Sequence, residues 1–189
     1  MLAGQDAPRS HAHHVYIVLE AVKTVALLAG GILLLVAGLT RCCGPWHRDT
    51  LTARIQHALA LRHLGRLPEA ESELGQTMQA LSVSLGRFHL DVLRSRAWHG
   101  VLLHELGRPD EARAELTAAV EEMTRLLGAD HPHTLRHRAH LASLLRDLGH
   151  PDQAQAEYDT ALRSAEHVLG AGHPLTTMIR SAAERPVRG

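Results

Sequence analysis

The 189-residue chain is poor in cysteine, in aromatic residues and in net charge. Its two cysteines, Cys42 and Cys43, are adjacent and cannot join distant segments, which excludes a disulfide framework. Only 3% of the residues are aromatic, so the hydrophobic share of 45% comes mainly from Ala, Leu and Val, a composition that suits helices best. The 20 basic and 20 acidic side chains cancel, and this balance argues against nucleic acid as a partner.

One apolar run near the N-terminus is long enough to suggest a membrane span. Residues 24–39 carry no charge, and if Lys23 reaches toward the headgroups, residues 21–41 match the roughly 30 Å of a bilayer core. We therefore expect a disordered tail at 1–20, a single transmembrane helix at 21–41 and a short linker at 42–46. A cleaved or lipidated export signal and a buried core helix are the alternatives.

Basic residues are more frequent just after this segment than before it. The residues in question are Arg41, Arg48, Arg54 and Arg62 after it and Arg9 and Lys23 before it. The positive-inside tendency then places the C-terminal part of a single-pass membrane protein in the cytoplasm. Ala26 and Gly30 form a small-xxx-small pair, which would let two such helices associate into a homo-oligomer, although these residues are common in any span.

Three sequence markers recur every 42 residues beyond the linker. Leu-Gly pairs end at Gly65, Gly107 and Gly149, a second set ends at Gly86, Gly128 and Gly170, and histidines stand at His47, His89, His131 and His173. Such self-similarity indicates a repeat architecture, in which each unit is one supersecondary motif. Each histidine precedes a run of apolar residues at helical spacing and each Leu-Gly pair ends one, so every unit is predicted to form two helices.

The third unit, residues 131–172, shows both helices. The apolar residues are Leu135, Ala139, Ala142 and Leu145 in the first helix and Ala154, Tyr158, Ala161, Leu162 and Ala165 in the second. Ala142 corresponds to Ala58 and Gly100 in the earlier units, and small residues are needed where two helix axes cross closely. We interpret these positions as core.

The same unit also resembles a known family. Its sequence HPHTLRHRAHLASLLRDLGHPDQAQAEYDTALRSAEHVLG is similar to the 42-residue tetratricopeptide variant of kinesin light chains, which is abundant in actinomycete multidomain proteins. The resemblance covers residues 47–183, with full units at 47–88, 89–130 and 131–172, a partial unit at 173–183 that would form a capping helix, and a C-terminal tail at 184–189. It implies an all-α, right-handed helical solenoid whose inner face is lined by the first helix of each unit.

The resemblance also implies binding of protein segments without catalysis and without a cofactor. In this family, asparagines in the middle of the first helix grip the backbone of the ligand, and the matching positions here are Gln56, Trp98 and His140. We therefore expect a membrane-anchored scaffold for protein–protein interaction that is not an enzyme. The alternative is an exported cell-envelope assembly protein, with the repeats outside the cytoplasm.

Basic residues predominate on the predicted first helices and acidic residues on the second. Arg54, Arg96 and Arg138 recur at the repeat period, and Arg180 continues the row into the capping helix. These guanidinium groups would either pair with acidic residues on the second helices of adjacent units or bind the carboxylates of an acidic partner segment. On the second interpretation, Trp98 would be an aromatic anchor beside the arginine row.

Motifs for catalysis or metal binding are weak. The only lysine is at the membrane boundary, which excludes a Walker loop, and His104-Glu105 lacks the second histidine of a zinc-protease motif because Arg108 takes its place. His133, His137 and His140 could present three imidazoles to one metal ion, but no fourth ligand is evident. The tail residues His11, His13 and His14 form a second histidine group. A histidine-rich metal-binding protein is therefore the weakest alternative.

Overall fold

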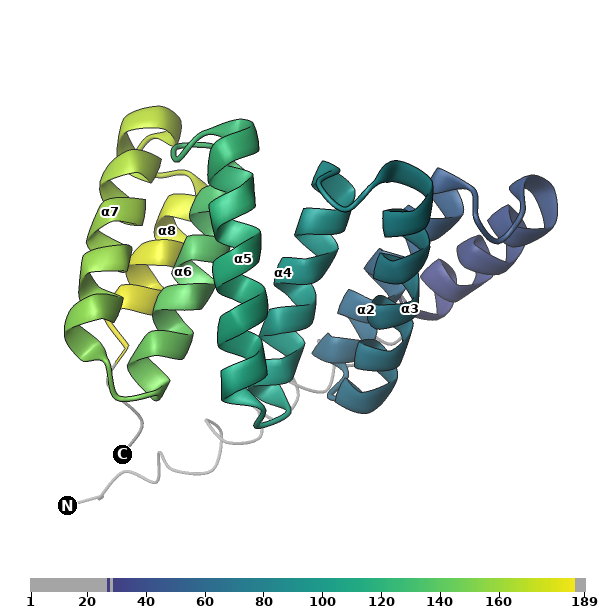
Figure 1. Ribbon diagram of the computed structural model, residues 1–189, viewed down its shortest axis with the longest axis horizontal. Helices are drawn as coiled ribbons and strands as arrows, with labels where there is room; N and C mark the ends of the chain where they lie inside the picture. Colours follow the sequence, from purple (N-terminus) through teal and green to yellow (C-terminus); the bar gives the residue numbers. More distant parts are fainter. Residues whose placement is uncertain (1–26, 28, 186–189) are drawn as a thin grey trace, which may run out of the picture. The chain divides into compact units, whose positions relative to one another are not determined.

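The computed structural model describes residue 27 and residues 29–185, and all regular structure in this part of the chain is helical. The labelled helices are α2 (Arg48–His63), α3 (Leu67–Leu85), α4 (Leu90–Glu105), α5 (Pro109–Leu127), α6 (Pro132–Asp147), α7 (Pro151–Leu169) and α8 (Pro174–Ala183) (Figure 1). Residues 29–43 are also helical. The predicted tail at 1–20 and residues 186–189 of the predicted C-terminal tail lie outside the described residues.

The first helix of every unit begins directly after the periodic histidine. His47, His89, His131 and His173 are the N-caps of α2, α4, α6 and α8. In each, the imidazole Nδ1 accepts a hydrogen bond from the backbone N–H two residues further on, at 3.1 to 3.3 Å. A capping acceptor of this kind pairs one of the free donors of the first helical turn. The prediction that these histidines start the helices is confirmed.

The six glycines of the Leu-Gly pairs end the helices, as predicted. Those after the first helices, Gly65, Gly107 and Gly149, have φ angles of 74°, 75° and 81°, and those after the second, Gly86, Gly128 and Gly170, have 84°, 94° and 88°. Glycine enters this left-handed region without the steric cost that a Cβ imposes, and such a residue commonly terminates a helix. The backbone hydrogen bonds show that two kinds of turn alternate: after a first helix the residue following glycine donates to the carbonyl five residues earlier, as Arg66 does to Leu61, whereas after a second helix the glycine donates to the carbonyl four residues earlier, as Gly86 does to Ser82.

The chain divides into two compact units, residues 1–70 and 71–189, with the division inside α3. In the first unit, the Thr50 hydroxyl donates a hydrogen bond of 2.9 Å to the Gly44 carbonyl oxygen and so fastens the linker to the first turn of α2. Along helical residues 29–43, by contrast, the consecutive side chains of Leu33, Leu34 and Leu35 are 51%, 76% and 53% exposed.

The predicted transmembrane helix lies only partly within the described residues. Residues 21–26 and 28 of the predicted 21–41 segment are outside them. Among the helices that are described, none has both the length and the apolar character needed to cross a bilayer. The span stays a prediction.

In the second compact unit, helices α4 to α8 pack in chain order, and Figure 1 shows α6 between α5 and α7. One buried cluster surrounds Leu116 and Met123 of α5, and another surrounds Tyr158 of α7 and Ile179 of α8. In the first cluster, a Cβ added at Gly100 would lie 2.8 Å from Leu116 Cγ, because α4 and α5 cross closely at this point. The prediction that Gly100 is a packing residue is confirmed.

Helix α8 closes the described stack. Its residues Leu175 and Ile179 are 3% and 0% exposed. From α6, Arg146 Nη1 donates hydrogen bonds to the carbonyl oxygens of Ala182, at 2.8 Å, and Arg185, at 3.0 Å. Carbonyl groups at a helix C-terminus lack donors within the helix, so this guanidinium group both caps α8 and ties it to α6.

Candidate functional site

The first helices of the repeats lie side by side in the second compact unit. Helix α4 packs against α6, and α6 against α8, whereas α5 and α7 contact this row but, in the described part of the chain, not each other. Residues on the same side of α4 and α6 therefore share one surface. We call the contact made by Trp98, His137 and His140 on this surface the α4–α6 seam.

Trp98 is the centre of the α4–α6 seam. Its ring centroid lies 5.2 Å from that of His137, at an interplanar angle of 84°, and 5.3 Å from that of His140, at 57°. The indole is half-buried and packs against the buried cluster around Leu116. Edge-on aromatic contacts contribute about 0.5 to 1.5 kcal/mol beyond the area they bury. Two of the three predicted clamp positions, Trp98 and His140, are thus in contact, while Gln56 is exposed on α2 in the other compact unit.

His137 lies beneath the surface of the seam. It is 1% exposed, and its Nδ1 atom is buried without a hydrogen-bond partner. Burial holds the pKa of His137 well below its ordinary value of 6.5, and the neighbouring His140, Arg136, His133 and Arg94 lower it further. Burial and the nearby Arg94 also lower the pKa of His133. Both imidazoles are therefore neutral near pH 7, in surroundings of positive potential.

The histidine metal site, which was the weakest alternative from the sequence, is not assembled among the described residues. Among the described residues, no three His, Cys, Asp or Glu side chains come together in a way that could hold a metal ion. His137 and His140 have ring centroids 5.9 Å apart, and each ring contacts Trp98, whereas the His133 ring contacts that of His131. His11, His13 and His14 lie outside the described residues.

Three arginines of the predicted row form ion pairs with glutamates of the second helices. The ion pairs are Arg96 Nε with Glu115 at 2.9 Å, Arg138 Nε with Glu157 at 3.1 Å, and Arg180 Nη2 with Glu166 at 2.7 Å. The first two pairs join helices of one unit, and the third joins α8 to the unit before it. Arg54 lies on α2 in the first compact unit. Pairing with acids of the second helices was one of the two interpretations, although the partners of Arg96 and Arg138 belong to their own unit.

Two other arginines lie near the α4–α6 seam and were missed by the sequence analysis. Arg94 and Arg136 both lower the pKa of His133 and His137 by their positive charge. Arg94 Nη1 is 3.5 Å from Asp91 Oδ1, and its Nε atom is buried without a hydrogen-bond partner. The two arginines are one repeat period apart, so the periodicity was a signal that could have identified them.

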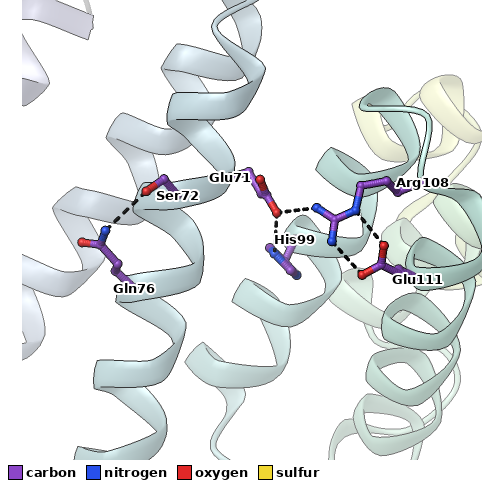
Figure 2. A network of polar contacts seen from close by, with 6 residues as sticks. All are labelled: Glu71, Ser72, Gln76, His99, Arg108 and Glu111. Atoms are coloured by element: carbon purple, nitrogen blue, oxygen red, sulfur yellow. Dashed lines mark hydrogen bonds and ion pairs between the residues drawn. The ribbon is translucent and has the colours of Figure 1, made fainter.

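A polar network links α3, α4 and the start of α5 (Figure 2). Arg108 donates two hydrogen bonds of 2.7 Å to the Glu111 carboxylate and one of 2.8 Å to Glu71, whose Oε1 atom is also 3.9 Å from His99 Nε2. The hydrogen bond from Arg108 lowers the pKa of Glu111 and raises that of Arg108. The carboxylates of Glu71 and Glu111 both accept hydrogen bonds from the Arg108 guanidinium group, so the network serves the packing of the repeats.

One shallow cavity of about 230 Å³ lies between α4 and α5. It is lined by Arg87, Phe88, Arg96, Ala118, Glu121 and Glu122. The Arg87 guanidinium carbon lies 4.4 Å from the Phe88 ring centroid, and Glu122 Oε1 accepts a hydrogen bond of 2.6 Å from Arg125 Nη1. Pockets for drug-sized ligands enclose about 300 to 1,000 Å³ and are mostly apolar, so this cavity does not resemble a small-molecule site.

Comparisons with known proteins identify the repeat. Residues 95–167 match a family model described as tetratricopeptide repeat, and residues 51–76 match a second model with the same description. The chain contains tetratricopeptide repeats. No curated protein sequence is similar enough to count as a match.

Solved structures share the fold of this tetratricopeptide chain. Two crystal structures from Podosopora anserina, of a protein assigned as a kinesin light chain with nearly identical TPR-like repeats, superpose with TM-scores of 0.68, for a single-residue variant, and 0.66. Both are 18% identical, over 95% of this chain and 86% of theirs. BtubC (BKLC) from P. vanneervenii has a TM-score of 0.57 at 15% identity, over 89% of this chain and 62% of its own. At such identities the likeness shows the fold alone, and it confirms the predicted all-α repeat fold.

Proposed function

We propose that this chain is a membrane-anchored scaffold that docks a segment of another protein along the row of its first helices. Tetratricopeptide repeats are protein-interaction modules, and repeat stacks present extended surfaces for this purpose. The observation that carries the proposal here is the α4–α6 seam, where a half-buried indole lies between two repeats with two imidazoles around it. Aromatic residues that are half-buried and held by neighbours are typical energetic centres of protein interfaces.

The chemistry around the α4–α6 seam favours an acidic partner segment. Arg94 and Arg136 give it a positive potential, which also acts on His133 and His137. Carboxylates of a partner would accept charge-assisted hydrogen bonds from these guanidinium groups while an apolar side chain covers Trp98. Arg96, Arg138 and Arg180 remain a second set of contacts in this proposal, and Arg54, in the other compact unit, stays a separate predicted contact. A partner carboxylate could replace Glu166 at small cost, because its ion pair with Arg180 is largely exposed and such pairs contribute under about 1 kcal/mol.

The membrane part of the proposal concerns residues 21–41. Leu33, Leu34 and Leu35 are consecutive in a helix, so their exposed side chains point in three directions. A helix that is apolar on several sides needs an apolar environment rather than a single partner surface. We propose that a bilayer supplies it and that the repeats lie on the cytoplasmic side, as the basic residues after the segment favour.

Affinity capture with the full chain tests the docking proposal. Trp98→Ala should weaken binding of the captured partner about thirtyfold, the equivalent of about 2 kcal/mol, without loss of helical content. Phe88→Ala is the matched control, since Phe88 is an exposed aromatic residue away from the seam. Arg94→Glu with Arg136→Glu should abolish capture, whereas Arg113→Glu, at an exposed position of α5, should not. Equal capture by all four proteins would refute docking at the α4–α6 seam.

Cell fractionation tests the anchor separately. The full chain should sediment with membranes, and deletion of residues 21–41 should release it. Protease added to intact cells should leave the repeats uncut if they are cytoplasmic. Cleavage of the repeats in intact cells would instead support the exported cell-envelope alternative.

A further inference from the structure

Histidine is concentrated on one helix of the stack. Helix α6 and its N-cap carry His131, His133, His137 and His140, and the ring centroids of the pairs 131–133 and 137–140 lie 5.4 and 5.9 Å apart. The preceding repeat has His89, Asp91, Ser95 and Trp98 at the same positions, each one repeat period earlier. Only the repeat built on α6, among the described units, therefore places four titratable rings along its first helix.

The buried member of this group is held uncharged by its surroundings. His137 is 1% exposed, and Nδ1 has no hydrogen-bond partner that a second proton could use. The groups that act on it are His133, Arg136 and His140 from its own helix and Arg94 from α4. All of them are cationic or become so on protonation. Of the charged groups that shift the pKa of His133 and His137, Asp91 alone is an acid, and it acts on His133.

The N-cap of α6 has the same dependence on a neutral ring. His131 Nδ1 can accept the backbone hydrogen bond only through its lone pair, which protonation removes. At the equivalent caps of α2 and α4, an aspartate carboxylate lies 3.8 and 3.7 Å from the histidine Nδ1 and could hold a protonated ring. In α6 that position is His133, which offers no such compensation.

We propose that the α4–α6 seam is a proton-sensitive contact, closed by neutral imidazoles and opened when His137 becomes protonated. A charged His137 must leave its site beneath Trp98 to reach water, and this separates α4 from α6. In acid the second compact unit thus loses the contact between α4 and α6. The N-cap of α4 is retained, because the Asp91 carboxylate can pair with a protonated His89. Loss of docking in the same pH range follows as well, and that consequence alone rests on the proposed function.

The size of the effect follows from proton linkage. The folded chain binds fewer protons at His137 than the unfolded chain, because the pKa is lowered on folding. Stability from this residue is therefore complete above the unfolded value of 6.5 and falls as the pH drops below it. Between about pH 7.5 and about pH 5.5, the unfolding equilibrium constant should rise by up to about tenfold through this one residue.

Urea unfolding of the full chain at these two pH values tests the proposal without any partner. In His137→Ser, which copies the residue at Ser95, the acid-induced rise should be smaller than in the natural protein, by a factor of up to about ten. His150→Gln is the control, because His150 is exposed and makes no side-chain capping bond. The His150→Gln protein should keep the full acid-induced rise in the unfolding equilibrium constant. Equal acid-induced rises in the natural protein and His137→Ser would overturn the proposal, and docking at the seam would be unaffected by that result.

A spectroscopic measurement covers the case in which His137→Ser does not fold. In a Trp46→Phe background, Trp98 is the one remaining indole, and its emission should change as the His137 imidazole, 5.2 Å away, takes up a proton. The change should precede the loss of helical content as the pH is lowered from about 7.5. Emission that stays constant until the helices unfold would overturn the proposal.

Discussion

The close crossing of α4 and α5 makes Gly100 a sensitive position. A Cβ there would lie 2.8 Å from Leu116 Cγ and 3.2 Å from both the Ala112 carbonyl oxygen and the Leu116 nitrogen. Two of these three contacts are with backbone atoms, so relief requires the helices to move apart. Overpacking of this kind costs about 1 to 3 kcal/mol. The replacement Gly100→Ala also gains about 1 kcal/mol of helix propensity, which partly masks the steric cost.

Gly75→Ala separates the two contributions. Gly75 also lies inside a helix, α3, but a Cβ there meets nothing within 4 Å, so this variant has the propensity gain alone. The free energies of unfolding of Gly100→Ala and Gly75→Ala should therefore differ by about 1 to 3 kcal/mol. For a chain of this size the melting temperatures would differ by roughly 2 to 12 °C, measured by circular dichroism at the helical minimum.

Comparison of these two variants can contradict the close approach of α4 and α5 at Gly100. A Gly100→Ala protein that melts at or above Gly75→Ala would mean that α4 and α5 do not approach as described. Adding Leu116→Ala removes the Cγ atom that the new methyl group meets. If the clash is real, the two substitutions should therefore be non-additive by about 0.5 kcal/mol or more, with the double variant less destabilised than the sum.

Three further outcomes test the contacts at helix ends. His131→Ala should lower the free energy of unfolding by about 1 kcal/mol in urea titrations, whereas His131→Asn should retain most of it because Asn is also a good capping acceptor. Arg146→Met should speed hydrogen exchange of the α8 amides, read by mass spectrometry, and leave α4 exchange unchanged; equal protection of α8 would contradict the capping role. Arg108→Gln should return the pKa of Glu111 upward to its ordinary value in an NMR titration, since the arginine hydrogen bond is the main cause that lowers it.

The helix boundaries could be read from the sequence because short-range rules fix them. A histidine followed by an apolar run and ended by Leu-Gly defines one helix through backbone capping and a left-handed glycine, and both depend only on neighbouring residues. The same signals recur in every unit, so each one confirms the others. Periodicity therefore predicted the repeat fold, the turns and the packing role of Gly100.

The side of the helix on which a residue lies was harder to predict. The repeat period says that Arg96 and Arg138 are equivalent, but not which surface they share. Arg96 and Trp98 are two residues apart, which is about 200° around a helix, so they cannot lie on the same surface. Arg94 and Trp98 are four apart and can. The sequence-based prediction placed Trp98 beside the arginine row, which this spacing does not allow. The burial of His137 depends on packing between helices and left no local sequence signal.

The alternating glycine turns have a consequence for how the gene can change. Gly65, Gly107 and Gly149 share nearly one φ value, and Gly86, Gly128 and Gly170 are similarly close to one another. Each unit thus begins and ends with nearly the same backbone geometry. Recombination that inserts or removes one whole unit between equivalent glycines would join matching ends and leave both neighbouring helices capped. The number of repeat units can therefore change during evolution without a new type of turn between helices. Only the packing surface between newly adjacent units then needs to adapt.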